Sequence, residues 1–177
     1  DPLPPPPPCP PSSSSTDAII SPPIPPSPSS DNKKKWLTIG IPTVPREADH
    51  LGATLDSVLS QLPTSKVDPL FENVLIIVMN MHGEGHTFYE QAKAKYASPH
   101  PKANYLLFAA DTEPHPDPMP NSKDVGDANH PGFRVRKQTR NIASLMAHSF
   151  GRSNFFMFSE DDMELCSHGM MALQHML

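Results

Sequence analysis

The chain has 177 residues and a formal net charge of −5, and 13 of its 24 prolines fall within the first thirty residues. The acidic balance argues against a general nucleic-acid-binding surface. The longest apolar run, residues 74–79, is far shorter than the roughly 20 residues that span a bilayer. The two cysteines, Cys9 and Cys166, are too few for a disulfide framework and wrongly spaced for zinc. Because the chain begins with Asp1 and closes on what reads as an interrupted helix, we expect a piece of a longer protein.

Residues 1–35 lack the means to build a core. They combine the prolines with eight serines and end in three consecutive lysines. Proline donates no backbone hydrogen bond, and serine buries little apolar area against the entropy of the chain. We therefore predict a disordered stem or linker over 1–35 and one folded region over 36–177. The five prolines at 4–8 have a second interpretation, a docking motif for an aromatic-lined groove, although composition favours a spacer.

Strands and helices alternate along the folded region. Apolar residues at period two predict a strand over 36–44, and apolar residues on one helical face predict a helix over 51–62. Further along, we predict strands over 73–81, 104–110 and 154–158, helices over 87–97 and 133–150, and a long polar loop over 111–132. This order predicts an α/β fold with a mostly parallel sheet that is covered on both faces.

Ligands of such a sheet bind outside the carboxyl ends of its strands, and three features of the sequence converge there. They are the PTVPRE loop at 42–47, the HGEGH turn at 82–86 and an acidic triplet at 160–162. Adjacent carboxylates repel one another, so a stable fold needs a cation or hydrogen-bond donors nearby. Mg²⁺ and Mn²⁺ are often held by one or two carboxylates together with substrate phosphates.

The acidic triplet has two interpretations, a metal site and a solvated acidic turn. Its position directly after the apolar strand at 154–158 favours the metal site. Side chains alternate along an extended chain, so Glu160 and Asp162 are expected to point one way and Asp161 the other.

The helix predicted at 133–150 begins with a concentration of positive charge. Four of the fourteen lysines and arginines of the chain fall between Arg134 and Arg140. Cations in a first helical turn oppose the helix dipole, and such a violation is often found where a ligand binds. Arg136 and Arg140 lie one turn apart, a spacing that suits a diphosphate, although a basic solvated face explains the pattern equally well. The inward-facing residues of this helix are predicted to be Ile142, Leu145, Met146 and Ser149.

Other chemical motifs are weaker. His82 and His86 have the spacing of a zinc-binding helix, but Gly83 and Gly85 favour a turn, and we predict a loop. The patterns of a P-loop and of a hydrolase nucleophile elbow are absent. Three methionines, Met170, Met171 and Met176, are predicted to pack in the core, and Cys166 to be a lone thiol that is buried or bonded beyond Leu177.

Three segments together resemble the conserved region of glycosyltransferase family 54, which includes the N-acetylglucosaminyltransferase IV enzymes. They are WLTIGIPTVPRE at 36–47, VRKQTRN at 135–141 and FFMFSEDDM at 155–163. The resemblance covers the whole folded region and implies a GT-A fold that is incomplete at its C-terminus. It also implies Mn²⁺ or Mg²⁺ as cofactor, UDP-GlcNAc as donor, and inverting transfer in β1,4 linkage to a mannose of a glycoprotein N-glycan. The stem would then follow a membrane anchor upstream of Asp1, in a type II protein of the Golgi lumen.

The resemblance also implies roles for individual residues. Asp162 would be the direct metal ligand, and Glu160 and Asp161 would hold the ribose and the donor sugar. The nucleotide pocket would be lined by Thr43, Arg46 and Glu47, with Arg136 and Arg140 facing the diphosphate or the uracil. The catalytic base and the acceptor site would come after Leu177, so we expect this chain to bind nucleotide without turnover.

Besides a degenerate transferase, against which the intact triplet argues, two other classes of function stay open at this point. One is a GT-A transferase that acts on a GPI glycan or a cell-wall mannan, which acceptor profiling of the longer protein would distinguish. The other is a non-catalytic interaction protein that presents the run of prolines on a sheet domain. It predicts binding to SH3- or WW-type domains and no metal-dependent binding of UDP.

Overall fold

The computed structural model describes residues 34–111 and 131–177, which all belong to one unit, Lys33–Leu177. In chain order, its elements are β1 (Lys35–Thr43), α1 (His50–Ser60), β2 (Val74–Asn80), α2 (Thr87–Lys95), the 3-10 helix η1 (Ala103–Tyr105), β3 (Leu106–Ala110), α3 (Phe133–Ser149), β4 (Ser153–Phe158) and α4 (Gly169–Met176). Each strand and helix predicted above is present within two residues of its expected ends. The predicted stem at 1–35 and polar loop at 111–132 lie almost wholly outside the described residues.

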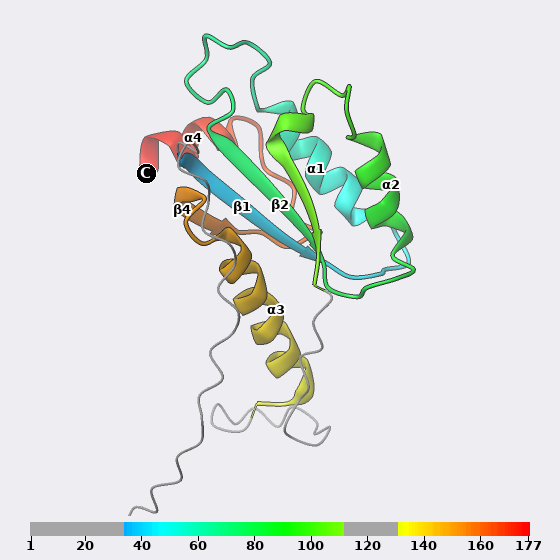
Figure 1. The fold of residues 1–177 in the computed structure, drawn as a ribbon. Helices are drawn as coiled ribbons and strands as arrows, with labels where there is room; N and C mark the ends of the chain where they lie inside the picture. The colour runs from blue at the N-terminus through cyan, green and yellow to red at the C-terminus, as the bar shows by residue number, and fades with distance from the viewer. Residues whose placement is uncertain (1–33, 112–130) are drawn as a thin grey trace, which may run out of the picture. The chain divides into compact units, whose positions relative to one another are not determined.

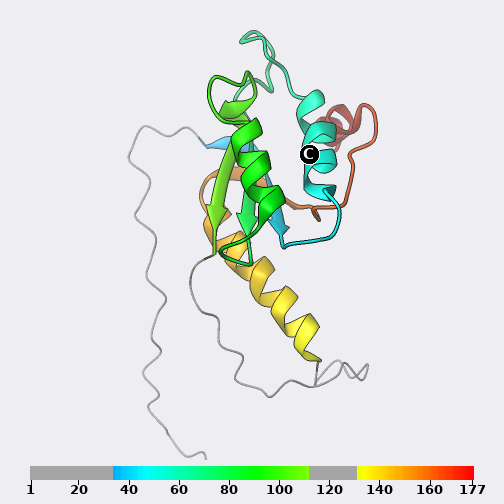
Figure 2. The same cartoon turned by 90° about the vertical axis from the view of Figure 1, so that its right-hand side faces the viewer.

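The four strands form one parallel sheet in the order β3-β2-β1-β4. In Figures 1 and 2, α1 and α2 cover one face of this sheet, and α3 crosses the other. The chain therefore steps outward from β1 to β3 and then returns to the far side of β1, which reverses the direction of winding between β1 and β4. This confirms the predicted α/β class and parallel sheet. In open sheets of this kind, the reversal marks the crevice in which ligands bind.

The larger part of the core lies between the sheet and the layer of α1 and α2. Its buried apolar residues include Leu37, Ile39, Ile41, Val74, Ile76 and Val78 from the strands and Leu51, Leu55, Val58 and Leu59 from α1. The alternate strand residues face α3, where Leu145 is fully buried with Ile77 and Met79. The two faces thus follow the two-residue period of a strand, and α1 follows the helical period that the sequence predicted.

Gly40 lets α3 pack closely against the middle of β1. A Cβ atom at this position would lie 2.8 Å from Cδ2 of Leu145 and 2.8 Å from Cε2 of Phe156. Carbon atoms pack favourably at about 3.5–4.0 Å, so any side chain at position 40 would displace both neighbours. The glycine therefore permits the close approach of Leu145 on α3 and Phe156 on β4 to the middle of β1.

The predicted burial of three methionines is wrong. Met146, Met171 and Met176 are 53%, 55% and 79% exposed, whereas Met170 is buried as predicted. Leu145 and Ser149, one turn apart, are the buried residues of α3, and Met146 lies about 100° around the helix from Leu145. A single buried stripe therefore faces the sheet, and hydrophobic side chains beside it stay exposed. Ile142 is half-buried.

Candidate functional site at the carboxyl edge of the sheet

The loops after β1 and β4 leave the sheet side by side at the point where the winding reverses. A backbone hydrogen bond of 3.0 Å from Ser159 N to Gly40 O continues the pairing of β4 with β1 past the last residue of β4. On the other side of β1, Met81 N donates to Thr43 O at 2.9 Å. The acidic triplet and the PTVPRE loop therefore come together, as the sequence predicted for this edge.

Asp161 is the buried centre of the site. Its side chain is 4% exposed, and both carboxylate oxygens accept hydrogen bonds. Oδ2 accepts from the Thr43 hydroxyl at 2.7 Å, and Oδ1 accepts from Arg46 Nη2 at 2.8 Å. The main-chain carbonyl of Asp161 accepts from the hydroxyl of Thr54 on α1 at 2.9 Å. A buried carboxylate needs such donors, and here one comes from β1 and one from the loop after it, while α1 supplies the donor to the main-chain carbonyl.

Glu160 and Asp162 are exposed whereas Asp161 is buried, and the chain forms a turn at 161–162 instead of the extended backbone on which the predicted alternation depends. The side chain of Asp162 is 36% exposed, and its Oδ2 lies 3.6 Å from Arg46 Nη1. Arg46 thus spans Asp161 and Asp162 while 41% of its own side chain remains exposed. The hydrogen bond and the charge of Asp161 raise the pKa of the Arg46 guanidinium above its ordinary value. A fixed positive charge consequently lies beside the exposed carboxylate.

His86 also belongs to the site, although its sequence pattern predicted only a loop. Its ring is 2% exposed, and its Nε2 lies 2.9 Å from the Thr43 hydroxyl oxygen. Nδ1 accepts from the backbone N–H of Tyr89 at 3.4 Å, so His86 also caps the first turn of α2. Burial lowers the pKa of His86, which favours the neutral ring. A buried chain of hydrogen bonds therefore runs from α2 through Thr43 to Asp161.

The HGEGH turn has the geometry that its glycines predicted. Gly83 and Gly85 have φ angles of 87° and 82°, which favour glycine. Asn80, at the end of β2, shapes this turn because its side chain accepts from His82 N at 2.9 Å and donates to Gly83 O at 2.6 Å. The turn brings the chain to His86 at the start of α2.

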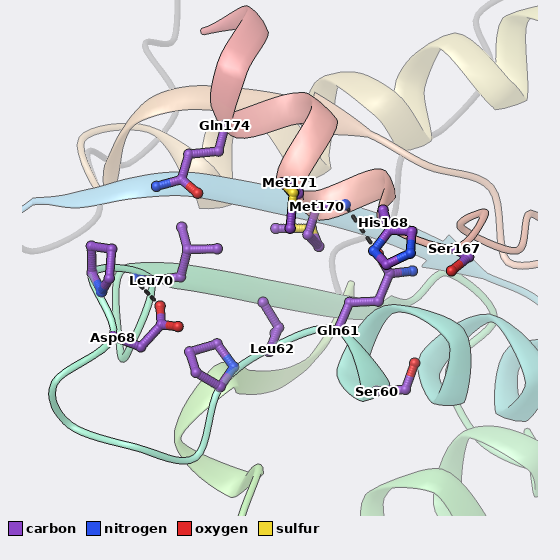
Figure 3. Close-up of a pocket in the computed structure, with 12 residues that line it drawn as sticks. Ser60, Gln61, Leu62, Asp68, Leu70, Ser167, His168, Met170, Met171 and Gln174 are labelled. Carbon is purple, nitrogen blue, oxygen red and sulfur yellow. Dashed lines mark hydrogen bonds between the residues drawn. The ribbon is translucent and has the colours of Figure 1, made fainter.

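A polar stripe on α1 holds the segment that follows the triplet. After Thr54, Ser57 accepts from Leu165 N at 3.0 Å. Gln61 donates to Cys166 O at 2.9 Å and accepts from Met170 N at 3.1 Å, the second of which is drawn in Figure 3. Thr54 and Ser57 of α1 and Gln61, which caps its C-terminal end, lie on one side of the helix at spacings of three and four. This spacing was a usable signal in the sequence that the predictions above did not include.

The other predicted site residues are Glu47, Arg136 and Arg140. Glu47 is exposed in the loop between β1 and α1. The N-terminal half of α3, which carries Arg136 and Arg140, projects past the carboxyl ends of the strands in Figures 1 and 2. The guanidinium of Arg136 donates to the carbonyl of Pro131. The expected contacts of these residues with a nucleotide stay predictions.

The exposed carboxylates of Glu160 and Asp162 are too few to hold a divalent ion by themselves. They suit an ion that also takes ligands from a bound molecule. Within 34–111 and 131–177, no three His, Cys, Asp or Glu side chains are grouped closely enough to hold a metal ion. Asp161 has both oxygens engaged, which leaves Asp162 and Glu160 as carboxylate ligands. One or two carboxylates, with water and phosphate oxygens, are a common set for Mg²⁺. Glu160 and Asp162 are therefore the residues of the triplet that would hold such an ion together with other ligands.

Two hollows accompany the sheet. One, of about 460 Å³, lies between the C-terminal end of α1, the following loop and α4; Figure 3 shows residues that line it, among them Gln61, Leu70, His168 and Met170. Because α1 runs antiparallel to the strands, this hollow is at the opposite edge from Asp161. The other, of about 480 Å³, is lined by Gly85, His86, Thr87, Glu90, Gln91 and Ala94. It adjoins the buried chain of hydrogen bonds that ends at Asp161. Cys166 is a free, exposed thiol, so the predicted alternative in which it is buried is wrong.

No protein-family model, curated protein or solved structure matches the chain. The α/β class therefore rests on the strands and helices themselves, and the likeness to glycosyltransferase family 54 stays a prediction from the sequence. In the part of the chain that the structure describes, none of the helices has the length and apolar character needed to cross a membrane.

Proposed function

We propose that the chain is the donor-binding part of a metal-dependent, inverting glycosyltransferase of the GT-A type. The reaction would move N-acetylglucosamine from UDP-GlcNAc to a mannose of an N-glycan in β1,4 linkage. One observation carries the proposal. The acidic triplet lies where the direction of winding of the sheet reverses, and within it Asp161 is buried whereas Asp162 is exposed. The donor and acceptor are proposed from the resemblance of 36–47, 135–141 and 155–163 to family 54.

The exposed groups suit the charge of a nucleoside diphosphate. Asp162, with Glu160 beside it, would hold Mn²⁺, and a bound divalent ion neutralises negative charge on a leaving diphosphate. Arg46 is held by Asp161 through Nη2 and has further N–H groups on its exposed side. Its planar guanidinium suits phosphate oxygens, and because it is already oriented, little reorganisation is needed when a ligand binds. Arg136 and Arg140 are proposed as additional contacts for the diphosphate or the uracil.

The location of the protein is proposed on the same basis. The resemblance to family 54 supports a type II protein of the Golgi lumen, with the segment at 1–35 as the stem.

Calorimetric titration of UDP into the 177-residue chain, with and without Mn²⁺, tests the proposal. Circular dichroism first shows that each protein is folded. We expect binding that needs Mn²⁺, and we expect Asp162→Asn to weaken it at least about tenfold, since a charged ligand is lost. Glu164→Gln is the matched control, because it removes one negative charge from an exposed residue two positions further on.

Three outcomes would count against the proposal. One is a folded chain that binds no UDP in the presence of Mn²⁺. A second is equal weakening by Asp162→Asn and Glu164→Gln, which would indicate only a general effect of charge. The third concerns the donor: competition by UDP-glucose as effective as that by UDP-GlcNAc would remove the support for N-acetylglucosamine.

A further inference from the structure

The hydrogen bonds between His86, Thr43 and Asp161 have one consistent arrangement of protons. The Thr43 hydroxyl has a single hydrogen, and the ionised carboxylate of Asp161 can only accept. The hydroxyl therefore donates to Asp161, and its oxygen accepts from His86 Nε2. Nδ1 of His86 accepts from Tyr89 N, so it carries no proton. The contacts thus assign His86 as a neutral ring with its hydrogen on Nε2.

We propose that His86 is a positioning residue for the site. By donating to Thr43, it directs the Thr43 hydroxyl to Asp161, which in turn orients Arg46 and the carboxylate of Asp162. The inference rests on the proposed function as far as the ligand is concerned. The chain of hydrogen bonds that it invokes is defined by the protein alone.

Burial makes this route effective. Thr43 is 1% exposed, His86 is 2% exposed and Asp161 is 3% exposed, so water does not replace a lost donor without rearrangement. Without the His86 donor, the oxygen of Thr43 keeps an unused lone pair in the interior, and of the two hydrogen bonds that orient the hydroxyl only the one to Asp161 is left. Arg46 would then be held by a carboxylate whose other partner is less firmly oriented.

Two substitutions separate this positioning role from the capping role of the same ring. Asparagine places an acceptor near the position of Nδ1 and retains the cap on Tyr89, but it offers no donor near Nε2. Glutamine reaches the position of Nε2 with an N–H donor for Thr43 and loses the capping acceptor. His86→Asn therefore removes the link to the site, and His86→Gln removes the cap.

The experiment measures UDP affinity in the presence of Mn²⁺ for the full chain and both variants. We expect His86→Asn to weaken binding about tenfold, a typical effect of one buried hydrogen bond. His86→Gln should stay within about threefold of the wild type, although loss of a cap makes it the less stable variant. Urea unfolding of each protein supplies the stability. If the losses of affinity follow the losses of stability, or if both variants bind equally weakly, His86 has only a structural role.

Two NMR readouts test the inference without a ligand. The ¹⁵N shifts of the His86 ring report its tautomer, and a hydrogen on Nδ1 in the wild type would overturn the proposal. The rotation of the Arg46 guanidinium reports how firmly Asp161 holds it; we expect faster rotation in His86→Asn and unchanged rotation in His86→Gln. Unchanged rotation in both would also overturn it. If the wild type binds no UDP while these readouts behave as expected, the proposed function fails and the positioning role stands.

Discussion

Replacing Asp161 with asparagine should destabilise the fold itself, because the carboxylate serves as an acceptor twice. Its two oxygens receive the hydroxyl of Thr43 and the guanidinium of Arg46. An asparagine has one side-chain oxygen, so its NH₂ group must face one of these donors. If Thr43 instead accepted from this NH₂, its own proton would have to go to His86 Nε2. The remaining hydrogen of His86 would then lie on Nδ1, facing the N–H of Tyr89.

No arrangement of protons therefore keeps every hydrogen bond in Asp161→Asn. A hydrogen bond to a charged group contributes about 1.5–3 kcal/mol, and a buried donor left unpaired costs about 1–3 kcal/mol. The side chain of Arg46 is 41% exposed, so water compensates on that side and the lower part of the combined range applies. We expect a loss of about 2–4 kcal/mol in the free energy of unfolding, which corresponds to a fall in Tm of roughly 5–15 °C.

Urea unfolding at pH 7 measures this loss, with circular dichroism and the fluorescence of Trp36, the single tryptophan, as probes. Asp162→Asn is the control because it makes the same chemical change on the neighbouring, more exposed side chain, where about 0.5 kcal/mol or less is expected. If the two variants lose stability to within about 1 kcal/mol of each other, the described division between a buried and an exposed carboxylate is wrong.

Two further predictions concern stability. Gly40→Ala should lower the free energy of unfolding by about 1–3 kcal/mol, because the new Cβ meets Leu145 and Phe156 at 2.8 Å. Urea unfolding should show a smaller loss when the same substitution is made in a Leu145→Ala background, and equal losses would argue against the contact. Burial lowers the pKa of His86 in the folded protein, so as the pH falls the unfolded chain takes up this proton before the folded chain does. The free energy of unfolding should therefore decrease as the pH drops from about 6.5, the ordinary pKa of histidine, through the lowered pKa of the folded state. Unfolding between pH 7.5 and 5 should show this dependence in the wild type and a weaker one in His86→Gln.

The elements of this fold were predictable because their signals are local. The period-two pattern of β1, the helical period of α1 and the apolar runs of β2 and β3 each depend on a few consecutive residues. The alternation of strands and helices then leads to a parallel sheet. The reversal at β1 could not be predicted from such patterns, because strand order depends on which pairings bury the most surface.

The burial of α3 shows where local patterns stop being sufficient. A helical wheel assigns Leu145 and Met146 to the same broad apolar face, yet Leu145 is 0% exposed and Met146 is 53% exposed. Gly40 creates the gap that Leu145 fills, and Gly40 lies more than one hundred residues earlier in the chain. Which residue of an apolar face is buried is thus decided by a distant residue.

His86 shows the same limit for the site. Its neighbours Gly83 and Gly85 correctly indicated a turn, and this turn was expected at the same edge of the sheet as the PTVPRE loop, but neither pattern indicated that the His86 ring is buried against Thr43. A buried histidine, a threonine hydroxyl and a carboxylate come from three separate elements, so their spacing in the sequence contains no motif. Only the parallel pairing of β1 with β2 brings the turn after β2 next to the end of β1.

The structure also changes how an acidic triplet is to be interpreted. Three consecutive carboxylates suggest three ligands, but here the middle one is buried while its two neighbours are exposed. Here the middle residue, Asp161, accepts donors from β1, the loop after it and α1, so it fastens the triplet to the sheet. Asp162 and Glu160 remain available because Asp161 is held. Of the triplet, Glu160 and Asp162 therefore keep exposed carboxylates near Arg46, and under the proposed function these are the two that would hold a divalent ion.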